Sequence, residues 1–149
     1  MNPPALCMLT IEHLRGSVVP FSLSFERGKK LTIVYGENGT GKTTICDASE
    51  FLAKGKIGSL EGRGLGNKTE RYWPSIGKTS ADIAVTLQAE TSTCKATILK
   101  GKISTQPDNQ RPNVEVLRRS QILRLLEAQP AQRYAEISRF IDIAGVTNS

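Results

Sequence analysis

The chain has 149 residues and a mass of 16.2 kDa, which is the size of one domain. Hydrophobic residues make up 38% and charged residues 23% of it, an ordinary globular mixture. The net charge of +6 and the isoelectric point of about 9.4 favour a polyanionic partner such as nucleic acid, although a soluble domain with one basic face has the same balance.

Several classes of protein are excluded by what the sequence lacks. Its three cysteines, Cys7, Cys46 and Cys94, stand far apart, which argues against a disulfide framework or a zinc site. His13 is the only histidine, so histidine clusters and triads that need a second histidine are excluded. No apolar run approaches the roughly 20 residues that span a bilayer. The N-terminus does not have the pattern of a signal peptide, so we expect a cytoplasmic protein.

The first half of the chain predicts strands followed by a helix. Residues 5–14 ("ALCMLTIEHL") and 21–26 ("FSLSFE") have strand character, and the second of these alternates with period two. Residues 31–35 ("LTIVY") are rich in β-branched side chains and predict a buried strand. From Thr43 to about Lys54, apolar residues recur at helical spacing.

The second half predicts loops and short elements. Glycines and basic residues dominate residues 55–80, which predict a long loop with little regular structure. The other expected elements are antiparallel strands over 82–90 and 94–101, a loop over 101–113, a strand over 114–117, and helices over 121–128 and 131–144 separated by Pro130.

The most informative stretch lies between the third expected strand and the first helix. Gly36, Gly41, Lys42 and Thr43 satisfy the pattern G-x-x-x-x-G-K-[ST]. Glycines let the loop fold around a phosphate, and successive backbone N–H groups then form an anion-binding nest. The lysine adds a cation for the β- and γ-phosphates, the threonine hydroxyl suits Mg²⁺, and the helix that follows directs its positive end at the same phosphates.

The residues around this loop resemble those of a known family. "GENGTGKTTICDASEFL" is similar to the SMC, RecF, RecN and SbcC group of ATPases, whose loop reads G-x-N-G-x-G-K-[ST]. The resemblance covers most of the chain. It implies an α/β P-loop NTPase fold of the ABC/SMC head type, with a mixed sheet and an antiparallel strand layer, and it implies ATP and Mg²⁺ as cofactors. It assigns ATP binding to Gly36, Glu37, Asn38, Gly39, Thr40, Gly41, Lys42, Thr43 and Thr44, with Lys42 catalytic and Thr43 on the metal.

Two further residues enter through the resemblance. In "EHLRG", Arg15 occupies the basic position of an N-F-R-like element that lies near the nucleotide in some members, while His13 and Leu14 replace the usual Asn and Phe. Gln121 matches the family's Q-loop glutamine, which implies a catalytic role and a place in the magnesium shell. Ile122 stands where a glycine is usual.

A hydrolytic site also needs a carboxylate at the end of a buried strand. Asp142 lies in a predicted helix, Asp82 follows a polar segment, and Asp47 lies on the helix after the loop, where local pairing is expected. No signature-like L-S-G-G segment is present. In the resembled family these parts belong to a C-terminal lobe beyond a coiled coil. We therefore expect residues 1–149 to be the N-terminal lobe of a larger or divided head, and an ATPase only when completed.

The resemblance further implies action on DNA, in repair, chromosome maintenance or defence against phages and plasmids. It implies an ATP-dependent pairing with the chain's own C-terminal lobe or with a second head, and no membrane partner. The segment from Lys54 to Lys78 is a candidate for nonspecific DNA binding through its basic side chains. The alternative is a solvated loop whose Tyr72 and Trp73 pack onto the sheet. The basic residues are Lys54, Lys56, Arg63, Lys68, Arg71 and Lys78.

Three other functions fit parts of this sequence. A GTPase would need N-K-x-D after a strand, whereas "NKTE" at Asn67–Glu70 ends in Glu and follows glycines. A small-molecule kinase would need an arginine-rich lid where two antiparallel strands are expected. A non-catalytic, nucleotide-gated dimerisation or DNA-binding module stays open, because the acidic half of a hydrolytic site is missing.

Overall fold

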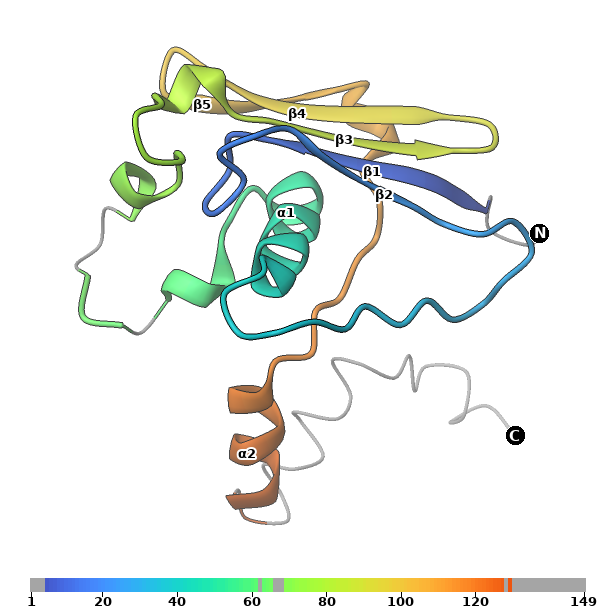
Figure 1. Ribbon diagram of the computed structural model, residues 1–149. Coiled ribbons are helices and arrows are strands. Elements are labelled where there is room, and N and C mark those ends of the chain that lie inside the picture. The colour runs from blue at the N-terminus through green and yellow to red at the C-terminus, as the bar shows by residue number, and fades with distance from the viewer. Residues whose placement is uncertain (1–4, 62, 66–68, 128, 130–149) are drawn as a thin grey trace. The chain divides into compact units, whose positions relative to one another are not determined.

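The computed structural model describes residues 5–61, 63–65, 69–127 and 129 of the chain (Figure 1). The chain divides into two compact units, Met1–Val114 and Glu115–Ser149. All described strands lie in the first unit, and the second contributes helix α2 (Arg119–Glu127). Neither α1 nor α2, the α-helices of the described ranges, has the length and apolar composition of a membrane span.

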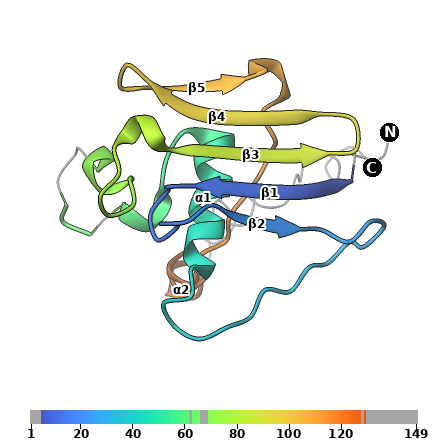
Figure 2. The ribbon, with the colours of Figure 1, turned by 45° about the horizontal axis from the view of Figure 1, so that its top comes forward.

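The first unit is built on a five-stranded sheet in the order β2-β1-β3-β4-β5 (Figure 2). Every pairing in it is antiparallel, so the expected antiparallel strand layer is present, whereas the expected mixed sheet is not seen among the described strands. Thr10 of β1 pairs with Ser22 on one side and Thr86 on the other. Four of its strands confirm predicted ones, at residues 5–14, 21–26, 82–90 and 94–101. The strands are β1 (Leu6–Glu12), β2 (Phe21–Ser24), β3 (Ala84–Ala89), β4 (Thr93–Leu99) and β5 (Lys102–Gln106).

Helix α1 (Lys42–Lys54) lies along one face of this sheet, as both ribbon views show (Figures 1 and 2). It confirms the helix predicted from Thr43 to about Lys54. It begins after Gly41, whose φ of 92° is in the left-handed region, and ends at Gly55, where φ is 64° and the N–H donates to the Phe51 carbonyl. Both ends are thus set by glycines in a conformation that other residues rarely adopt.

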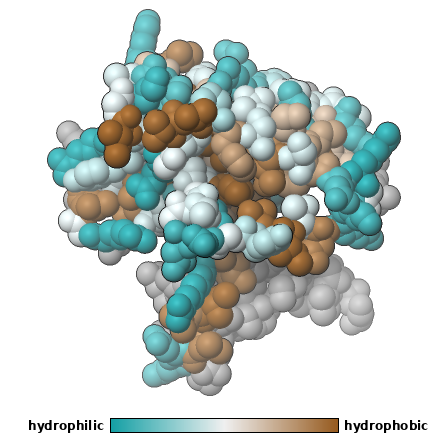
Figure 3. Space-filling model, in the orientation of Figure 1, coloured by the Kyte–Doolittle hydropathy of each residue, from teal (hydrophilic) through white to brown (hydrophobic). Residues whose placement is uncertain are grey.

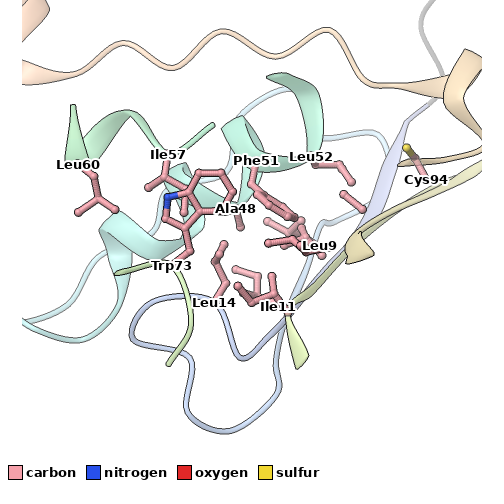
Figure 4. Close-up of a cluster of buried hydrophobic side chains, with 14 residues drawn as sticks. Leu9, Ile11, Leu14, Ala48, Phe51, Leu52, Ile57, Leu60, Trp73 and Cys94 are labelled. Carbon is pink, nitrogen blue, oxygen red and sulfur yellow. The ribbon is translucent and has the colours of Figure 1, made fainter. Parts of the chain in front are cut away.

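The hydrophobic core lies between α1 and the sheet (Figure 4). Phe51 is fully buried and meets the ring of Trp73 edge-on, with the centroids 5.7 Å apart. Trp73 comes from the long loop after α1, so this contact ties the loop to the helix. Other members are Leu9, Ile11, Leu14, Ala48, Leu52, Ile57, Leu60, Val85, Cys94 and Ala96.

The long loop predicted for residues 55–80 is confirmed in its described part. It contains only single 3₁₀ turns, η1 (Gly58–Leu60) and η2 (Glu70–Tyr72), and a third, η3 (Ser80–Asp82), precedes β3. In η3 the Asp82 carboxylate accepts bonds from the N–H and hydroxyl of Thr79, which lower the pKa of Asp82. Residues 62 and 66–68 lie outside the described residues.

The prediction of a strand before the phosphate loop is wrong. Residues 31–35 are extended but belong to no strand of the described sheet, and Leu31, Ile33 and Tyr35 are exposed to 74%, 74% and 91%. Figure 1 shows them within a long excursion that leaves β2 and returns to α1. The run has high strand propensity, but a strand also needs a neighbour for its backbone N–H and C=O groups. No described segment supplies one.

Two predictions nearer the C-terminal end also need correction. Residues 101–113 were expected to form a loop but contain β5 and the 3₁₀ turn η4 (Asp108–Gln110). Residues 114–117 were expected to form a strand and are not assigned to one. Helix α2 confirms a helix near 121–128, whereas the helix expected over 131–144 lies outside the described residues.

The core predicts a large stability effect at Phe51. Replacing Phe51 with alanine removes its contacts with Trp73 and leaves a cavity under the sheet, so we expect a loss of about 3–5 kcal/mol in the free energy of unfolding. Urea denaturation followed by circular dichroism measures it. The control is Ile76→Ala, since Ile76 is 91% exposed; this change should stay within about 0.5 kcal/mol of the parent. Equal midpoints for both variants would contradict the proposed core.

Candidate functional site

Residues 36–41 form a tight loop that leads into α1. Gly39 and Gly41 have φ values of 90° and 92°, which other residues adopt only with strain. The Thr40 N–H and hydroxyl both bond to the Glu37 carbonyl, at 3.4 and 2.9 Å, and close the turn. Beyond it, the Thr44 N–H donates to the Gly41 carbonyl at 2.9 Å as α1 begins, and the positive end of the helix favours an anion here.

The Lys42 side chain lies back across this loop. Its ammonium group donates to the carbonyl oxygen of Gly36 at 2.7 Å and to that of Glu37. A Cβ on Gly36 would come within 3.0 Å of the Thr40 hydroxyl, so the loop is closely packed at this point. The ammonium charge is therefore held at the loop itself.

A cleft of about 470 Å³ opens in front of the loop. Two cationic residues line it, Arg15 and Lys42, together with Thr43, Thr44 and the acidic Asp47. The remaining lining residues are Gly16, Asn38, Gly39, Gly41, Tyr72, Pro74 and Ile76. A second cavity of about 340 Å³ shares Gly16, Gly41 and Thr44 with it and has a mainly apolar lining. Two adjoining cavities, one with charged lining residues and one with a mainly apolar lining, thus open at the start of α1.

The cleft brings together most of the residues predicted from sequence. Arg15, Asn38, Gly39, Gly41, Lys42, Thr43 and Thr44 line it, while Gly36, Glu37 and Thr40 form the closed turn behind Lys42. Gln121 lies in α2, in the second unit, and its predicted role in catalysis and metal binding stays a prediction.

The backbone around Arg15 is strained and firmly held. His13 and Arg15 both have a φ of 55°, and Leu14 between them is fully buried and pairs with Pro74 in an isolated bridge. The Arg15 N–H donates to the Trp73 carbonyl at 2.7 Å, and the Ser75 N–H donates to the His13 carbonyl at 2.8 Å. Such conformations persist only when their surroundings fix them, and they gather at functional sites.

Asp47 is a lining residue for which the sequence indicated only local pairing. Its side chain is 1% exposed, and its carboxylate lies 3.4 Å from the Nε of Arg15. The Ser59 hydroxyl donates to the same oxygen at 2.6 Å. Arg15 and Ser59 are both distant from Asp47 along the chain, so no local pattern could reveal these contacts.

The residues present suit a triphosphate with Mg²⁺. The glycine cradle, the helix start and two cations provide for the phosphates, and the exposed Thr43 hydroxyl is a suitable magnesium ligand. The described residues contain no group of three or more His, Cys, Asp or Glu side chains that could hold a metal. Mg²⁺ commonly needs no such cage, because substrate phosphates and water complete its shell.

Comparisons with known proteins agree with this geometry. A family model described as an AAA domain matches residues 9–145. The chain is similar to a solved structure described as "Structural biochemistry of ATP-driven dimerization and DNA stimulated activation of SMC ATPases", with a TM-score of 0.65 and 14% identity over 93% of this chain and 100% of that one. No curated protein matches. The α/β P-loop fold class predicted from sequence is thereby confirmed. The chain belongs to the AAA domain family, and its fold is similar to that of the solved SMC ATPase structure.

Proposed function

We propose that residues 1–149 are the N-terminal, ATP-binding lobe of an SMC-like ATPase head that acts on DNA in the cytoplasm. The observation that carries the proposal is the cleft in which Arg15 and Lys42 meet the glycine loop and the start of α1. The description of the similar solved structure names ATP-driven dimerization and DNA stimulated activation of SMC ATPases. Both features are extended to this chain as part of the proposal, with repair, chromosome maintenance and defence as the candidate processes.

The cleft supports ATP binding better than it supports hydrolysis by the lobe alone. A hydrolytic site needs a carboxylate that can accept a proton from attacking water. Among the described residues that line the cleft, only Asp47 carries one, and Arg15 and Ser59 already engage it. The activating carboxylate therefore has to come from elsewhere, and we propose the chain's own C-terminal lobe or a second head as its source.

The exposed segment at residues 31–35 supports completion by another part of the protein. Thr32 and Val34 line an apolar cavity of about 270 Å³ with Leu9, Leu23 and Ile45. Their neighbours Leu31, Ile33 and Tyr35 are exposed large hydrophobic residues, and Figure 3 shows apolar side chains exposed on the face drawn there. An extended apolar segment next to the phosphate loop is suited to pair with an added strand, whose backbone would satisfy its hydrogen bonds.

The proposed ATP site predicts a loss of affinity when Lys42 is replaced. Replacing Lys42 with alanine removes the cation held at the loop, so ATP binding should weaken by at least about tenfold. Titration of the purified chain with a fluorescent ATP analogue in the presence of Mg²⁺ measures this. Lys102→Ala is the control, because Lys102 is an exposed residue at the start of β5, and it should bind like the parent. Unchanged affinity in the Lys42 variant would count against the site.

Measuring phosphate release from the same samples distinguishes a lobe that only binds ATP from a complete ATPase. The parent chain should bind ATP and release phosphate no faster than the Lys42→Ala variant. A Mg²⁺-dependent turnover that disappears in the variant would show that the lobe already contains its own activating carboxylate. If ATP is bound without turnover even after a C-terminal lobe is added, the non-catalytic, nucleotide-gated module is the better description.

DNA binding is proposed for the basic loop after α1. In the described part of that loop Lys56, Arg63, Arg71 and Lys78 are exposed, so they are available to a phosphate backbone. Arg71 also lies over the Tyr72 ring, 4.6 Å from its centroid. Trp73 is buried and meets Phe51 of α1, whereas Tyr72 is 38% exposed, so of these two aromatic residues Trp73 is the one that packs into the core.

The test replaces Arg63, Lys68 and Arg71 together with alanine; Lys68 lies outside the described residues. Affinity for duplex DNA should fall, and the slope of log affinity against log salt should drop by up to about 0.9 for each lost phosphate contact. ATP binding should not change. The charge-matched control replaces Lys95, Lys100 and Lys102 of the β4–β5 hairpin. If both triple variants lose affinity equally, or neither does, the loop has no special role.

A further inference from the structure

The cleft contains an ion pair whose purpose ATP binding alone does not explain. The Arg15 Nε lies 3.4 Å from the Asp47 carboxylate, with Arg15 27% and Asp47 1% exposed at their side chains. Both residues line the same cleft as Lys42 and Thr43. A buried carboxylate here is unexpected, because a negative charge repels the phosphates that the rest of the cleft is suited to hold.

Asp47 is itself held in place. The Ser59 hydroxyl donates to its Oδ2 at 2.6 Å, and this oxygen is also the one nearest Arg15. Asp47 projects from α1, whose orientation is fixed by the buried Phe51 and Leu52. The carboxylate therefore presents a fixed acceptor to whatever approaches it from the cleft.

Arg15 depends on such an acceptor. Its backbone is fixed by the strained turn and by the bond to the Trp73 carbonyl, but its side chain has several rotatable bonds of its own. The guanidinium group also donates to the Tyr72 carbonyl, at the long distance of 3.5 Å. The Asp47 contact is about as long, at 3.4 Å, but it joins two full charges, so it is the stronger restraint on the direction in which the charge of Arg15 points.

We propose that Asp47 is a positioning residue, which holds the guanidinium of Arg15 toward the bound triphosphate and which Ser59 in turn orients. The inference rests on the proposed binding of ATP to this cleft. An arginine held in advance loses less side-chain entropy when it meets a phosphate, and this gain exceeds the repulsion from a carboxylate that is already paired.

The proposal and simple electrostatics predict opposite effects of Asp47→Asn on the affinity for ATP. If Asp47 only adds negative charge, Asp47→Asn should tighten ATP binding. If Asp47 positions Arg15, the same change should weaken it by about tenfold, since a charge-assisted contact is then lost or misdirected. Asparagine keeps the size of the side chain and can still accept the Ser59 bond, which limits disturbance of the fold.

The experiment is a double-mutant cycle on the full chain, with a fluorescent ATP analogue and Mg²⁺ as the probe. The proteins are the parent, Asp47→Asn, Arg15→Met and the double variant, and thermal melts check the fold of each. The matched control is Asp108→Asn, since Asp108 pairs with the Nε of Arg111 at 3.0 Å on the surface. If the parent does not bind the ATP analogue, the proposed function itself is wrong, whatever the role of Asp47.

The proposal expects both single variants to weaken binding and the double variant to be no weaker than Arg15→Met, within about twofold. It is overturned if Asp47→Asn binds as tightly as the parent or tighter, or if the two losses multiply. Should Asp47→Asn fail to fold, Ser59→Ala takes its place in the cycle. That variant should weaken binding by a few-fold, and only while Arg15 is present; a loss that persists with Arg15→Met would overturn the proposal.

Discussion

The packing of α1 against the sheet is the constraint on which the rest of the first unit depends. Ala48, Phe51 and Leu52 are almost completely buried, so the helix can neither turn nor slide without opening the core. Its N-terminal end is therefore presented in one direction. The left-handed conformation of Gly41 starts the helix directly after the phosphate loop, and this places Lys42 and Thr43 on the cleft.

The buried side of α1 is not purely apolar, and its acidic residues connect two parts of the molecule. Asp47 meets Arg15 at the cleft and Ser59 in the loop after the helix. Glu50, one turn later, accepts the Gly58 N–H at 2.8 Å, and a Cβ on Gly58 would fall 2.6 Å from that carboxylate. The start of the basic loop is therefore fixed to the same helix that carries the phosphate site. The contacts of Asp47 with Ser59 and of Glu50 with Gly58 thus connect the cleft directly to the start of this loop.

The sequence predicted what depends on local chemistry. The phosphate loop, α1, β1 and the β3–β4 pair follow from glycine positions and from apolar periodicity within a few residues. It failed where pairing partners decide whether a strand forms. The apolar run at 31–35 pairs with no described strand, whereas the polar β5 forms because Lys100 and Gly101, both with positive φ, turn it back onto β4. A two-residue turn ending in glycine is a hairpin signal that could have revealed β5.

The proposed roles of Lys42, Arg15 and Asp47 all require that the cleft in front of Gly39–Thr44 binds a nucleoside triphosphate. The most direct measurement is a ¹H–¹⁵N titration of the labelled chain with ATP and Mg²⁺, which follows every backbone amide and the Nε of Arg15 at once. If ATP binds in this cleft, the largest shifts will occur at the amides of residues 36–44 and at Arg15, with saturation at one ligand per chain. Shifts that are absent, or that spread over the sheet while these amides stay unmoved, would contradict it.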